Sequence, residues 1–69
     1  MPEAVTSTDI AFVQAHWENL DLEMREAMLT DRSRLLRWMK RLLKVKVQGL
    51  GDGGAAVMAC QIATQMFGT

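Results

Sequence analysis

The chain has 69 residues, no net formal charge, one cysteine and one histidine, and 49% of its residues are hydrophobic. This length leaves room for one domain with a small core, and a single cysteine excludes an intramolecular disulfide. No set of Cys and His residues has zinc-ligand spacing, so packing and self-association remain as the sources of stability.

The first dozen residues carry Glu3 and Asp9 and lack the basic segment of a secretory signal peptide. The uncharged stretch 53–69 is shorter than the roughly 20 apolar residues that a membrane-spanning helix needs. Together with the lone cysteine, these features favour a cytoplasmic protein. We expect residues 1–5 to form a flexible lead and residues 6–69 to form a single helical domain.

A first helix is predicted over residues 8–29. Thr6 and Asp9 have the spacing of a capping box. Apolar residues then recur every three or four positions, as one side of a helix requires. These seam residues are Ile10, Val13, Trp17, Leu20, Met24 and Ala27. No Gly or Pro interrupts the seam, so we expect one continuous helix whose apolar ridge is sheltered by another helix.

A second helix is predicted over residues 32–46, after a turn in which Asp31 is the N-cap. Since this turn contains no Gly or Pro, one long bent helix is the alternative. The glycine-rich segment 49–54 then ends the helix. A third helix is predicted over residues 54–67, capped by Asp52 and ended by Gly68. The predicted fold is therefore all-α, a helical hairpin with a third helix, stabilised by self-association.

The charges are segregated along the chain. Seven of the eight basic residues lie between positions 32 and 46, and seven of the eight acidic residues lie at or before Asp31. The favoured interpretation is a hairpin with complementary acidic and basic rims. The main alternative is a nucleic-acid interface on the basic helix. Its candidate contacts are Arg34, Arg37, Trp38, Lys40, Arg41 and Lys44. A third alternative is an amphipathic helix on a membrane surface, formed by residues 35–44.

The segment 49–54 also matches the glycine spacing G-x-G-x-x-G of dinucleotide sites. A chain of this size cannot build the surrounding βαβ unit, and Asp52 would repel a phosphate. The segment is therefore predicted to be a linker between helices, with phosphate binding as the alternative in a longer protein.

Nothing in the sequence indicates catalysis. His16 has no nucleophile near it in sequence, and no basic residue follows Lys46 that could activate Cys60. We expect no catalytic residue, cofactor, metal or small-molecule substrate.

The high apolar content and six methionines, which suit adaptable contacts, favour a protein-interaction role. The predicted function is a non-catalytic regulator or adaptor that binds a protein partner or itself, as a homodimer or higher oligomer. Nucleic-acid binding is the alternative, and membrane binding is less favoured. The expected interface residues are Ile10, Val13, Trp17, Leu20, Met24, Met58, Met66 and Phe67.

Overall fold

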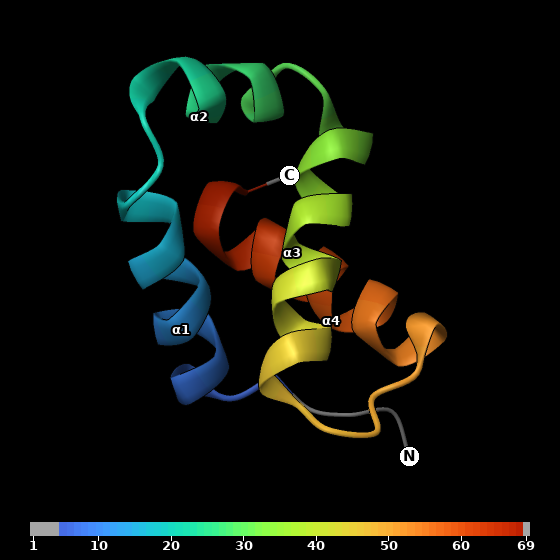
Figure 1. The fold of residues 1–69 in the computed structure, drawn as a ribbon. Helices are drawn as coiled ribbons and strands as arrows, with labels where there is room; N and C mark the ends of the chain where they lie inside the picture. The colour runs from blue at the N-terminus through green and yellow to red at the C-terminus, as the bar shows by residue number, and fades with distance from the viewer. Residues whose placement is uncertain (1–4, 69) are drawn as a thin grey trace.

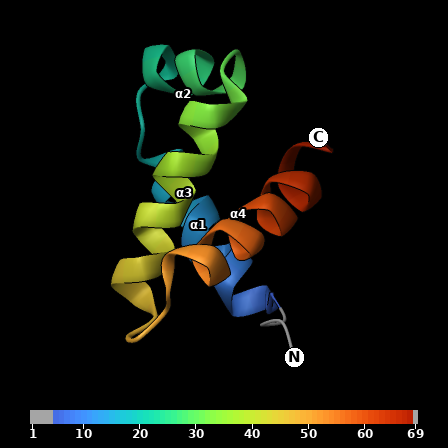
Figure 2. The same cartoon turned by 90° about the vertical axis from the view of Figure 1, so that its right-hand side faces the viewer.

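The computed structural model describes residues 5–68, which form four helices and no strand. The helices are α1 (Ser7–Glu18), α2 (Leu22–Leu29), α3 (Arg32–Lys46) and α4 (Asp52–Phe67). α1 and α3 lie side by side in opposite directions, and α2 lies across one end of the pair (Figure 1). α4 crosses α3 obliquely (Figure 2). The all-α prediction is confirmed; most of the predicted N-terminal lead lies outside the described residues.

The structure divides the helix predicted over residues 8–29 into α1 and α2. α1 begins with the predicted capping box: the Thr6 hydroxyl accepts a hydrogen bond from the Asp9 N–H, and the Asp9 carboxylate accepts one from the Thr6 N–H. It ends at Glu18, and Asn19 is its C-cap. Asp21 then has an extended backbone, and its carboxylate accepts a hydrogen bond from the Met24 N–H at 2.8 Å. A new helix therefore starts without any Gly or Pro.

This break changes which apolar residues face the core. The predicted seam continues from Leu20 to Met24 and Ala27. In the structure Met24 is 45% exposed, whereas Met28 is buried at 2% exposure. The restart at Asp21 rotates α2 relative to α1, because a continuous helix would keep the three-and-four spacing in phase. Other helices cover the apolar ridge of α1 as expected, but in α2 the side chain that faces the core is that of Met28 and not that of Met24.

Removing the Asp21 cap should destabilise the fold measurably. We expect Asp21→Ala to lower the free energy of unfolding by about 0.5–2 kcal/mol, since the Met24 N–H loses its side-chain acceptor. Asp21→Asn retains an acceptor and should stay within about 0.5 kcal/mol of the parent chain. Urea unfolding followed by circular dichroism measures both. Equal losses in the two variants would show that charge, and not capping, matters at this position.

The other helix boundaries follow the sequence closely. α3 has the predicted bounds, and the Asp31 carboxylate accepts from the Arg34 N–H, so the single bent helix is excluded. α4 begins two residues early, at Asp52, and its N-cap is Gly51 rather than Asp52. Gly68 ends α4 with the left-handed backbone (φ 72°) that favours glycine.

The core lies mainly between α3 and α4. Its buried residues are Val13, Met28, Leu35, Met39, Leu43, Met58, Ala59, Ile62 and Ala63. Three residues on one face of α3 oppose small and medium residues of α4, and small side chains let two helices approach closely. The apolar face of the segment 35–44 thus packs inside the domain through Leu35, Met39 and Leu43.

Candidate functional site

The three lysines of α3 are engaged within the chain. Lys40 and Lys44 donate to the Asp52 carboxylate at 3.1 and 3.2 Å, which joins α3 to the start of α4. The hydrogen bond from Lys40, followed by that from Lys44, lowers the pKa of Asp52 from its usual 3.8. Lys40 and Lys44 were both candidate nucleic-acid contacts, and the structure places them against a carboxylate instead.

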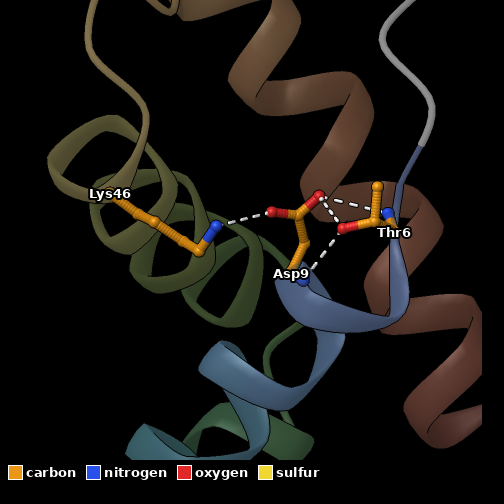
Figure 3. Close-up of polar contacts among 3 residues, drawn as sticks. All are labelled: Thr6, Asp9 and Lys46. Atoms are coloured by element: carbon orange, nitrogen blue, oxygen red, sulfur yellow. Dashed lines mark hydrogen bonds and ion pairs between the residues drawn. The ribbon is translucent and has the colours of Figure 1, made fainter.

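Lys46 joins the end of α3 to the start of α1. Its ammonium donates to the Asp9 carboxylate at 3.0 Å, and Figure 3 shows the same carboxylate bonded to Thr6. The hydrogen bond from Lys46 is the largest influence on the pKa of Asp9 and lowers it; burial acts in the opposite direction, and the Thr6 bonds lower it further. The Asp9 side chain is only 9% exposed and that of Lys46 is 27% exposed, so water reaches this ion pair from the lysine side.

Three arginines of α3 behave differently from the lysines. The side chains of Arg34, Arg37 and Arg41 form no ion pair or hydrogen bond with any described residue, and all three residues are exposed. Within residues 5–68, no acidic residue of α2 or of the turns beside it forms an ion pair with any of these three arginines. Within residues 5–68, the predicted pairing between the acidic first helix and the basic helix 32–46 is therefore limited to the ion pair of Asp9 with Lys46.

These arginines line a hollow between α2 and α3. Its volume is about 350 Å³, and we call it the arginine groove. It is lined by Met24, Met28, Arg34, Arg37, Trp38 and Arg41. Trp38 is half-buried, and its ring packs edge-on against Trp17 with 5.7 Å between centroids. Trp17 in turn packs against Phe67 at 4.9 Å, so the groove wall is held by three helices.

Beside the groove, α2 exposes an unusual amount of apolar surface. Leu22 is 65% and Leu29 53% exposed. Their spacing places them on one side of α2 together with Glu26, and Glu23 lies next to them. We call these four residues, Leu22, Glu23, Glu26 and Leu29, the outer face of α2. Sequence reasoning missed this face because the seam from Ile10 to Ala27 defines the apolar side of the predicted helix, and Leu22 and Leu29 lie on its opposite side.

The structure places most of the predicted interface residues in the interior. Val13 and Met58 are buried. Five others are partly buried and pack against the core: Ile10, Trp17, Leu20, Met66 and Phe67. Met24 alone is exposed, and it lines the arginine groove. The structure therefore brings Met24 together with the arginines and Trp38, a combination that was not predicted as one site.

A second, smaller hollow of about 220 Å³ lies on the α4 side of Arg37. Ser33, Leu36 and Cys60 contribute to its walls.

Within the described residues, no group of three or more His, Cys, Asp or Glu side chains could hold a metal ion. Among residues 5–68 no helix has the length and apolar character needed to cross a membrane. No known protein family, curated protein or solved structure matches this chain.

Proposed function

We propose that this chain is a non-catalytic protein-interaction module that binds an acidic, apolar-bearing helix through the arginine groove. One observation carries the proposal. Arg34, Arg37 and Arg41 have no partner among the described residues and surround an open hollow that also presents Met24. A guanidinium can hold a carboxylate through two parallel hydrogen bonds, which suits an acidic partner.

The composition of the groove favours protein over nucleic acid. Arginine, tryptophan and methionine are the residues most enriched in the centres of protein interfaces. A nucleic-acid site on this helix would draw on all of its basic candidates for phosphate contacts and on an aromatic ring available for stacking. Lys40 and Lys44 instead hold Asp52, and the Trp38 ring is packed against Trp17. The nucleic-acid alternative thus retains three of its six candidate residues.

Binding to designed peptides tests this proposal. The probes are helical peptides with leucine at positions i and i+7 and either Glu or Lys between, together with a random DNA duplex. We expect the Glu peptides to bind, the Lys peptides not to bind, and Arg37→Gln with Arg41→Gln to weaken binding about tenfold or more. The control is Gln48→Glu with Gln65→Glu, which makes the same change in net charge at exposed positions elsewhere.

The outcomes separate the two functions. Tight DNA binding that falls steeply with salt and requires the same arginines would favour the nucleic-acid alternative. If the glutamine variant binds the Glu peptides as well as the parent chain does, or if the Lys peptides bind equally well, the arginine groove is not the binding surface.

A further inference from the structure

The chain itself carries a surface whose charges and apolar side chains fit the arginine groove. We propose that the outer face of α2 from a second copy of this chain docks into the groove. This inference rests on the proposed function and names its partner. The groove supplies guanidinium groups and a hollow, and the outer face supplies carboxylates and two leucines.

The charges of the two surfaces are complementary and are not used inside one chain. Glu23 and Glu26 form no ion pair with any described residue, as is also the case for Arg37 and Arg41. A groove for a foreign acidic partner would explain the arginines alone. Only a self-complementary surface also explains why acids and exposed leucines lie together on the neighbouring helix.

Helix geometry prevents one chain from satisfying both surfaces itself. Met24 and Met28 of α2 form a wall of the groove. Leu22, Glu26 and Leu29 lie on the opposite side of the same short helix, as their exposure requires. The outer face of α2 therefore points away from its own groove and can enter only the groove of another molecule.

Because the two surfaces lie on opposite sides of α2, copies meet head to tail. The outer face of α2 from the first copy enters the groove of the second, and the outer face of the second enters the groove of a further copy. Leucine side chains would fill the hollow beside Met24 and Trp38. The glutamates at its rim would accept hydrogen bonds from the arginine guanidinium groups. Both the apolar and the charged groups left exposed in one chain are covered in this arrangement.

Charge swapping with remixing tests this self-association. One variant reverses the groove, Arg37→Glu with Arg41→Glu, and the other reverses the helix, Glu23→Arg with Glu26→Arg. Molar mass is measured by light scattering from about 1 μM to about 1 mM, at low and at high salt. We expect the molar mass of the parent chain to rise with concentration within this range, as a head-to-tail contact requires, and to fall as salt rises, because exposed ion pairs are screened. Each variant alone should be monomeric over the whole range.

An equimolar mixture of the two variants should recover the self-association. Every contact between unlike variants is then complementary, since reversed α2 meets reversed groove and native α2 meets native groove. Circular dichroism of each variant establishes that it is folded. A second pair, Leu22→Ser with Leu29→Ser, retains every charge and should weaken self-association of the chain about tenfold or more.

Three outcomes would overturn the inference: a parent chain that is monomeric up to about 1 mM, a parent assembly that neither variant disrupts, or a mixture of folded variants that stays monomeric. A monomeric chain that still binds the Glu peptides through Arg37 and Arg41 would refute the second copy as partner and leave the protein-interaction function standing. A chain that neither self-associates nor binds the Glu peptides would refute both the second copy as partner and the protein-interaction function of the groove.

Discussion

Replacing Ile62 with alanine is expected to lower the free energy of unfolding by about 2–5 kcal/mol. Ile62 is fully buried in α4 and belongs to the core that α4 shares with α3. Truncation removes apolar contacts and leaves a cavity that the surrounding helices fill only in part. A domain of this length has a total stability of about 3–10 kcal/mol, so the loss is a large fraction of that stability and should move unfolding to a much lower urea concentration.

A graded series separates cavity formation from other effects. Ile62→Val removes one methylene group and should cost about 0.5–1.5 kcal/mol. Val57→Ala is the matched control on the same helix, because Val57 is 45% exposed and should change stability little. Urea unfolding followed by tryptophan fluorescence measures all three variants. A loss at Ile62→Ala no larger than that at Val57→Ala would mean that the contact between α3 and α4 is not the main source of stability.

The parts of the fold that the sequence predicted correctly depend on local chemistry. A capping box needs only Thr6 and Asp9, three positions apart, and the end of α4 needs only a glycine that tolerates the left-handed backbone. The bounds of α3 likewise follow from Asp31 and from the loop that contains Gly49, whose φ is 79°. Such signals act within a few residues and can be recognised without knowledge of the tertiary fold.

The break between α1 and α2 was missed although its signal is also local. Asn19 and Asp21 are residues that favour helix ends, since their short polar side chains compete with the helical backbone for hydrogen bonds. The apolar seam runs across them without interruption through Trp17, Leu20 and Met24. The seam alone therefore predicts one continuous helix. The restart is stabilised further by Arg25, whose side chain donates to the Leu20 carbonyl at 3.1 Å. Capping chemistry outweighed apolar periodicity here.

The candidate site could be predicted only in part because its key distinction is not local. In sequence, lysines and arginines of residues 32–46 form one basic block. In the structure, Lys46 pairs with Asp9, 37 positions away, and Lys40 and Lys44 pair with Asp52 across the interhelix loop. These long-range pairs divide the block into lysines that stabilise the fold and three arginines, Arg34, Arg37 and Arg41, that remain available. Only the fold reveals which bases are left free.

The pair between Asp9 and Lys46 should make stability depend on pH in the acid range. The pKa of Asp9 is lowered in the folded chain from the ordinary 3.8, so the carboxylate is favoured by folding. Its contribution is complete well above pH 3.8 and is lost as the pH falls through the lower pKa of the folded state. Asp9→Asn keeps an acceptor for Thr6 but loses the charge, and it should cost about 1–3 kcal/mol at pH 7.

The difference between the parent chain and Asp9→Asn is therefore expected to shrink towards zero between about pH 5 and pH 2. Thermal unfolding at each pH measures it, and the pair of Asp52 with Lys40 and Lys44 is present in both proteins and cancels from the difference. Lys46→Met should reduce the same acid dependence, because the Lys46 ammonium is the main cause that lowers the pKa of Asp9. If the difference stays constant across this range, Asp9 stabilises the fold as a neutral cap, and its ion pair with Lys46 contributes nothing measurable.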